Sequence, residues 1–258
     1  MSPPDRPKGE HRSAQHEGTP MRALRIVCGA LVVALLGLGV QAQPAAPVGR
    51  VYAPGAFDRL DVEGAARIRL TQGDRDQVFV AGDEAAQRGV EVDVVNSHLR
   101  IRAVGGWKFW REDRPAIEVQ VRKLSHVMLS GAGEVQAPGP IRGDQLVIGI
   151  SGSGSVRFDE LAVRQVNFDI SGAGDGQLAG RVEQLELNVS GRGKLVADQL
   201  RAARARVAIS GVANAELWVI DDLQLAISGA GKIDYWGQPV VRRAVSGVGS
   251  VTARGDKP

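Results

Sequence analysis

The chain has 258 residues, of which 43% are hydrophobic, 33 are glycine and one is cysteine. This apolar content can form a sizeable core and excludes a disordered chain overall. From Gln43 onward, 27 Lys and Arg stand against 26 Asp and Glu, a balance that excludes the basic surface of a nucleic-acid-binding protein.

The first element is a predicted secretory signal peptide at residues 21–42. Arg22 and Arg25 precede an apolar run at residues 26–40, and Val40 and Ala42 place small side chains before a cleavage point. The run is short for a membrane-spanning helix, so an uncleaved anchor is the alternative. We expect export to the periplasm or the cell surface, with cleavage after Ala42.

Four further regions follow from composition and pattern. Residues 1–20 are a predicted disordered upstream extension, because Met21 directly precedes the basic region and is an alternative start to Met1. Residues 43–55 are a predicted linker, residues 56–255 a single β-solenoid domain, and residues 256–258 a tail.

Within the domain, residues 57–121 have the pattern of degenerate early turns. Strands are expected at residues 78–80, 90–95, 99–103 and 117–121, with one helical turn at 83–88. Residues 60–68 have the same pattern of residue types as residues 128–135, with Glu63 at the position of the corner serine. We expect the terminal turns to act as caps. Arg243 is a charged residue in an otherwise apolar column, which fits a terminal layer near solvent.

The strongest signal is a Ser-Gly pair that recurs every 18 to 21 residues. The residue before each serine and alternate residues upstream are apolar, which is typical of a strand with one buried face. The seven pairs are predicted to form structural turns at Ser130 and Gly131, Ser151 and Gly152, Ser171 and Gly172, Ser190 and Gly191, Ser210 and Gly211, Ser228 and Gly229, and Ser246 and Gly247.

A second glycine follows each serine by three residues, except at Ala213. It indicates either a positive φ or a close approach between layers. Because one repeat cannot bury its own apolar face, we predict an all-β fold. Its form is a single-stranded parallel β-solenoid with three short strands per turn. An antiparallel sandwich is the competing fold.

These residues resemble a known family. The resemblance rests on Ile-Glu-Val-Gln-Val at residues 117–121, Leu-Ser-Gly-Ala-Gly-Glu-Val at residues 129–135, and Thr71-Gln72-Gly73. They are similar to the head-GIN-domain family, formerly a domain of unknown function and described as "putative autotransporter adhesin". The resemblance covers about residues 57–254 and implies an exported, right-handed β-helix-like fold with no established catalytic residues.

Two groups of aromatic residues are candidate ligand-binding sites. Trp218 and Trp236 both lie eight residues after a corner serine, in a column that also holds Asp159, Asp198 and Arg254. With Tyr235 they are predicted to form a flat platform for a sugar or peptide. The alternative is that the chain turns there and both tryptophans pack under a loop.

The second aromatic group, Trp107, Phe109 and Trp110, lies beside Lys108 and Arg111 in a predicted loop. Aromatic rings beside cations suit contact with a membrane or a partner protein. The alternative is a hydrophobic cover for the open end of the solenoid.

No motif predicts a metal site, a cofactor or a catalytic residue. The glycine pairs lack the spacing of a phosphate loop and the helix that follows one. Only two histidines, His98 and His126, follow Ala42, and they do not form a paired-histidine metal motif. We therefore expect a non-catalytic binding or scaffold protein of the envelope, with a glycan or protein partner, or with self-association through the solenoid ends. The alternative is a polysaccharide-active β-helix enzyme, for which Asp159, Glu160, Asp169 and Asp198 are the candidate acids.

The signal peptide gives a direct prediction. The exported chain should begin at Gln43, and Ala42→Leu should leave it uncleaved, because the peptidase requires a small residue before the scissile bond. Intact-mass measurement of the protein from cell fractions checks both expectations. Recovery of a chain that still carries residues 21–42 from the cytoplasm would contradict them.

Overall fold

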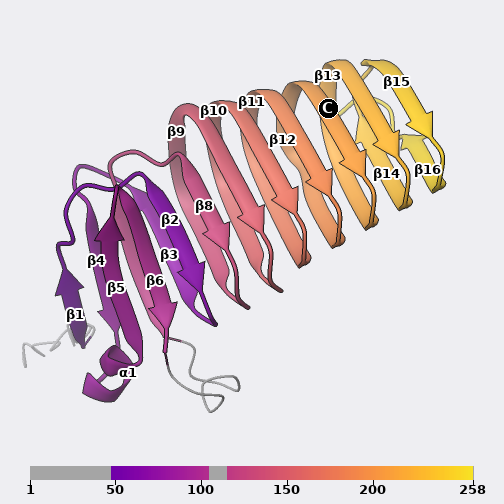
Figure 1. Cartoon of the computed structure of the whole chain (residues 1–258). Coiled ribbons are helices and arrows are strands. Elements are labelled where there is room, and N and C mark those ends of the chain that lie inside the picture. The colour runs from indigo at the N-terminus through magenta and orange to yellow at the C-terminus, as the bar shows by residue number, and fades with distance from the viewer. Residues whose placement is uncertain (1–47, 105–114, 258) are drawn as a thin grey trace, which may run out of the picture. The chain divides into compact units, whose positions relative to one another are not determined.

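The computed structural model describes residues 48–104 and 115–257, all within one compact unit at residues 45–258. This part of the chain is almost entirely β-structure (Figure 1). No helix in the described ranges is long and apolar enough to cross a membrane. In chain order the elements are β1 (Gly49–Tyr52), β2 (Arg59–Glu63), β3 (Arg67–Gln72), β4 (Gln77–Ala81), α1 (Glu84–Arg88), β5 (Val90–Val95), β6 (His98–Ala103), β7 (Ala116–Val121), β8 (His126–Leu129), β9 (Glu134–Ile150), β10 (Ser155–Ile170), β11 (Ala173–Val189), β12 (Arg192–Ile209), β13 (Val212–Ile227), β14 (Ala230–Trp236), β15 (Val240–Val245) and β16 (Val248–Ala253).

Five long strands, β9 to β13, form the regular part of the solenoid. Each has 16 to 18 residues and pairs in parallel with the strand one coil away. Successive turns are therefore hydrogen-bonded to one another, and Figure 1 shows them stacked side by side. This arrangement confirms the predicted parallel β-solenoid. The sandwich alternative is wrong for these coils, because it requires antiparallel pairing.

The three short strands expected in each turn are joined into one long strand. The parallel ladder continues past the second bend and shows only a register shift, for example between Phe158 and Leu161 where β10 pairs with β11. Each coil has a hydrogen-bonding neighbour on both sides, so the backbone groups at the bend keep their partners. From β9 to β13 the only full interruption per coil is the Ser-Gly corner, whereas β14 and β15 are separated by residues 237–239.

The seven Ser-Gly corners lie one above another, as the repeat predicts. The N–H of Ser190 donates to the Ile170 carbonyl oxygen over 2.9 Å, and the equivalent bond recurs at all seven corners. The glycine after each serine is packed against the backbone of the coil before it. A Cβ on Gly211 would approach the Gly191 carbonyl oxygen to 1.9 Å, so this position requires glycine.

The second glycine of each corner is needed for a different reason. None of these six glycines has a positive φ, so the close approach is the correct one of the two explanations. At all six positions the atom nearest to an added Cβ belongs to a side chain, and a Cβ on Gly231 would lie 3.2 Å from Ile209 Cδ1. Flexible side chains can move to make room for a methyl group. The equivalent position in the preceding coil is already an alanine, Ala213.

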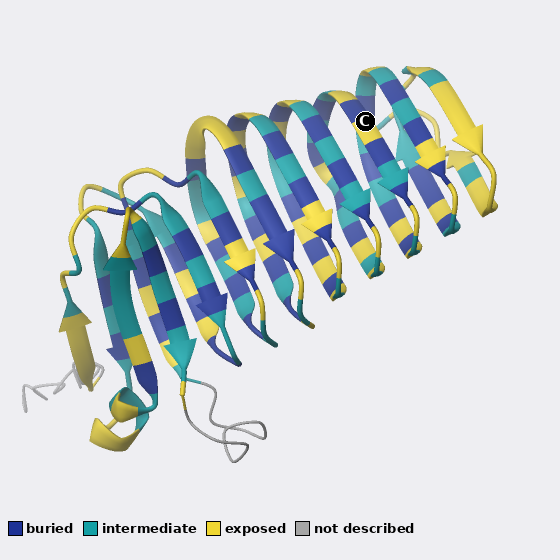
Figure 2. Ribbon diagram, viewed as in Figure 1, coloured by how far each residue is buried: buried dark blue, intermediate teal, exposed yellow. Residues whose placement is uncertain are grey.

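The core is a set of continuous apolar columns inside the coils. One column joins residues in direct register, and each member is at most 3% exposed: Ile148, Phe168, Leu187, Val207 and Leu225. Figure 2 shows buried residues alternating with more exposed ones along the long strands, such as β10 to β13. Full burial of one such side chain contributes about 1.5–3 kcal/mol, so the stacked columns supply the main stabilisation.

The N-terminal part contains the predicted strands, but they do not stack in chain order. Val62 of β2 pairs with Leu129 of β8, which places Glu63 at the serine position of its coil, as predicted. The coil of β2 and β3, however, lies between two later coils. It pairs in parallel with β6 and β7 on one side and with β8 and β9 on the other.

Antiparallel strands close this end of the solenoid. β4 pairs antiparallel with β7 and β1, and β5 pairs antiparallel with β6. The residues between β5 and β6, Asn96 and Ser97, have φ values of 51° and 64°, which is the backbone of a tight hairpin turn. The strands predicted at residues 78–80 and 90–95 are β4 and β5, and they are antiparallel capping strands rather than parts of early coils. For β5, this is because the hairpin reverses the chain before β6. The predicted helical turn is α1, with Asp83 accepting a hydrogen bond from the Ala86 N–H.

The other end of the described solenoid is open. Its last coil consists of β15 and β16, which pair with β13 and β14 in parallel. Val240, Val245 and Val248 are 60%, 43% and 81% exposed there. Arg243 is in register with Leu225 and is exposed, which confirms its predicted place in a terminal layer.

The two glycine positions give a matched prediction. Gly211→Ala should lower the free energy of unfolding by about 2 kcal/mol or more, because the new methyl group meets backbone of the adjacent coil. Gly231→Ala should lower it by less than about 1 kcal/mol, because isoleucine side chains can move. Urea denaturation followed by circular dichroism measures both. Equal effects of the two substitutions would contradict the stacking argument.

Candidate functional site

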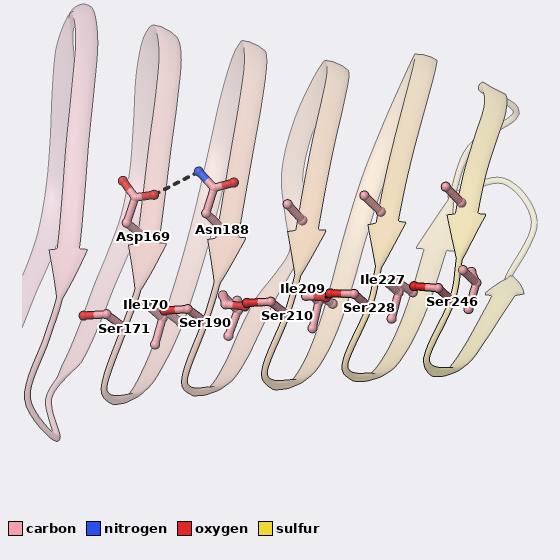
Figure 3. Close-up of a pocket in the computed structure, with 15 residues that line it drawn as sticks. Asp169, Ile170, Ser171, Asn188, Ser190, Ile209, Ser210, Ile227, Ser228 and Ser246 are labelled. Atoms are coloured by element: carbon pink, nitrogen blue, oxygen red, sulfur yellow. Dashed lines mark hydrogen bonds between the residues drawn. The ribbon is translucent and has the colours of Figure 1, made fainter.

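A groove of about 770 Å³ runs along the outer surface beside the corners of five successive coils (Figure 3). Each coil contributes its corner serine and the two residues before it. The lining residues are Asp169, Ile170, Ser171, Asn188, Val189, Ser190, Ala208, Ile209, Ser210, Ala226, Ile227, Ser228, Ala244, Val245 and Ser246.

Small side chains in one outward column explain the hollow. The residue two before the serine is alanine in three successive coils, at Ala208, Ala226 and Ala244. Toward the N-terminus the same column holds Asn188 and Asp169, whose side chains are joined by a 2.9 Å hydrogen bond (Figure 3). The floor of the groove is therefore apolar at the end formed by the three alanines and polar at the end formed by Asn188 and Asp169.

The corner serines line one side of this groove with hydroxyl groups. Ser210 Oγ lies 3.5 Å from the Val189 carbonyl oxygen, and Ser228 Oγ lies 3.4 Å from that of Ile209. Hydrogen bonds of this length are weak, and both serines are exposed. The hydroxyls can therefore turn toward a ligand. Neighbouring coils repeat about every 4.8 Å, so the groove presents a periodic row of donors and acceptors.

The sequence interpretation assigned these serines to turns and did not predict the groove. The signal was present in the repeat, because the outward column changes to alanine at Ala208, Ala226 and Ala244. The same strand alternation that buries Ile209 and Ile227 places both neighbouring columns on the outside.

Trp218 and Trp236 are brought together, as predicted, since they pair directly where β13 meets β14. Both side chains are partly buried. The Nζ atom of Lys257 lies 5.9 Å from the ring centroid of Trp218 and 4.8 Å from that of Trp236. The segment after β16 therefore lies over the two rings, a contact that sequence reasoning missed.

Tyr235, the third aromatic residue of the predicted platform, and Asp198 of the predicted column are placed differently. Tyr235 pairs with the fully buried Leu217 and packs against the core, whereas Trp236 pairs with Trp218. Trp218 is in register with Arg201 rather than Asp198, because the ladder shifts between Ala197 and Arg201. The in-register column is thus broken by three extra residues in β12.

Arg254 follows β16 and anchors the end of the last coil. Its side chain contacts Asp234 over 3.1 Å, and its N–H donates to the Tyr235 carbonyl oxygen. The hydrogen bond from Arg254 holds the pKa of the Asp234 carboxyl below its ordinary value. This ion pair ties Arg254 to β14.

The second aromatic group, Trp107, Phe109 and Trp110, lies outside the described residues. Its predicted contact with a membrane or partner stays a prediction.

The four candidate acids each have a polar or charged partner. Asp159 pairs with Arg157 over 2.7 Å, and Asp169 accepts from Asn188. Glu160 lies 3.9 Å from Arg142, and Asp198 lies 2.8 Å from Lys257. Each of the four acids therefore contacts a different polar or basic partner. Across residues 48–104 and 115–257, no group of three or more His, Cys, Asp or Glu could hold a metal ion.

Known families and structures match most of the chain. The model of the family described as "Putative auto-transporter adhesin, head GIN domain" matches residues 56–239. No curated protein matches the chain.

Solved structures match with the same fold. A "putative adhesin" from Bacteroides fragilis NCTC 9343 is 23% identical with a TM-score of 0.73, and the match covers 82% of this chain and 98% of that chain. A "Putative lipid binding protein" from Parabacteroides distasonis ATCC 8503 is 20% identical with a TM-score of 0.64, covering 81% and 97%. A "putative adhesin" from Parabacteroides merdae ATCC 43184 is 19% identical with a TM-score of 0.62, covering 81% and 96%. At these identities the likeness shows the fold alone.

Proposed function

The chain belongs to the head GIN domain family of putative auto-transporter adhesins, and on that premise we propose that it is an exported, non-catalytic binding protein of the cell envelope. The family description suggests an exported or surface protein, and the predicted signal peptide at residues 21–42 supports the same route. The ligand would lie in the groove beside the Ser-Gly corners.

The observation that carries this proposal is the repeating chemistry of the groove. Each coil offers one serine hydroxyl, and three coils offer an alanine methyl group beside it. A glycan chain has the complementary properties, because a sugar carries hydroxyl groups on its edge and apolar C–H groups on its face. A groove open along several coils accepts a long polymer better than a compact small molecule, which prefers an enclosed pocket.

A second role, self-association, is favoured by the open end of the solenoid. The last coil, β15 and β16, exposes strand edges together with Val240, Val245 and Val248. An unpaired edge strand is a template for another strand. The opposite end presents the antiparallel strands β1 and β5 rather than a parallel coil, so the proposed partner is the same open end of a second copy.

The groove proposal predicts a loss of glycan binding. Ala208→Arg with Ala226→Arg should weaken binding at least about tenfold, because two long side chains would fill the apolar floor, and tenfold corresponds to about 1.4 kcal/mol. Binding of the exported protein to a glycan array and to isolated envelope fragments measures this. Ala162→Arg, an exposed strand position outside the groove, is the matched control. Equal binding by the groove variant and the control would contradict the glycan proposal.

The self-association proposal predicts a change in molar mass. The exported protein should dimerise at high micromolar concentration, and Val248→Lys should leave it monomeric, because a buried charge without a partner opposes edge pairing. Size-exclusion chromatography with light scattering gives the mass of each. A monomer at all concentrations for the unaltered protein would rule this role out.

A further inference from the structure

We propose that Trp218, Trp236 and Asp198 form a binding site for a primary alkylammonium group, and that Lys257 occupies this site within the same chain. The site lies on the strand segments after the corners, whereas the groove lies on the segments before them. It therefore does not depend on the glycan proposal.

The position of one nitrogen atom carries the inference. Lys257 Nζ lies 4.8 Å from the centroid of Trp236, 5.9 Å from that of Trp218 and 2.8 Å from Asp198 Oδ2. Both tryptophan distances are within the range of a cation–π interaction. The same ammonium group thus contacts two aromatic faces and a carboxylate, and the Lys257 side chain is only 14% exposed.

The fold builds this site through one register shift. Trp218 and Trp236 are stacked in adjacent coils because β13 and β14 pair without a break there. In β12, residues 198–200 have no partner in β13, since Ala197 pairs with Leu217 and Arg201 with Trp218. The extra residues carry the Asp198 carboxylate to the Lys257 ammonium at the two rings.

Beyond Arg254, which is anchored to Asp234 and Tyr235, and apart from the contacts of Lys257 with Asp198, few contacts hold the chain segment that delivers Lys257. The Gly237 N–H donates to the Gly255 carbonyl oxygen over 2.9 Å, and Gln238 Nε2 donates to Asp256 over 2.7 Å. The second of these bonds is exposed, and exposed polar contacts contribute little to stability. A competing ammonium group from outside can therefore displace the segment.

The chemistry of the occupant defines the ligand class. Lysine presents a primary ammonium on a flexible alkyl stem, so the external ligand we infer is a lysine side chain of a second polypeptide. Lys257 competes with that ligand as a tethered group, and short tethers give effective concentrations in the millimolar range. The unaltered chain should accordingly bind added lysine weakly, and removal of Lys257 should reveal the site.

Calorimetric titration with Nα-acetyl-lysine methylamide tests the inference. The Lys257→Ala chain should bind this probe saturably, at least tenfold more tightly than the unaltered chain. Lys194→Ala, which removes an exposed lysine elsewhere on β12, should behave like the unaltered chain. Adding Asp198→Asn or Trp236→Ala to Lys257→Ala should weaken binding at least fivefold, because each removes one contact of the ammonium.

Three results would overturn the inference. The first is no saturable binding by Lys257→Ala, in which case Lys257 only fastens the last coil. The second is binding that Asp198→Asn leaves unchanged. The third is tighter binding of choline than of the lysine probe, which would reassign the site to a quaternary ammonium head group. The groove substitutions Ala208→Arg and Ala226→Arg should leave lysine binding intact, so failure of the glycan proposal is distinguishable from failure here.

Discussion

The close contact between backbones at the Ser-Gly corners is the constraint on which the rest of the structure depends. At each corner, a glycine Cα lies against the carbonyl oxygen of the preceding coil, and the serine N–H donates to that coil. This contact fixes the register of one coil on the next. Register in turn decides which side chains form the buried columns and which face solvent.

The regular coils could be predicted because their information is local and repeated. Each turn contains the same alternation and the same corner, so the columns of Phe168 and Leu187 follow from sequence alone. Even Glu63 could be assigned to the serine position of an earlier coil. The prediction of three separate strands per turn is wrong for β9 to β13, because a bend does not interrupt a ladder that has partners on both sides.

The features that sequence reasoning missed depend on contacts between distant segments. The coil of β2 and β3 lies between later coils, and no local pattern in residues 59–72 indicates that order. The shift between Ala197 and Arg201 comes from three extra residues whose effect appears only when β12 meets β13. Lys257 reaches Asp198 across 59 positions of sequence, so a prediction based on spacing within repeats could not include it.

The closed N-terminal end has a consequence for how such proteins change length during evolution. The coil of β2 and β3 is enclosed by neighbours on both sides, and antiparallel strands cover the layer beyond it. A duplicated repeat cannot enter there without separating strands that are distant in the chain. Between β9 and β13, however, an added repeat would meet parallel strands of the same kind above and below. Each duplication would extend the outer face by about 4.8 Å while both ends stay the same.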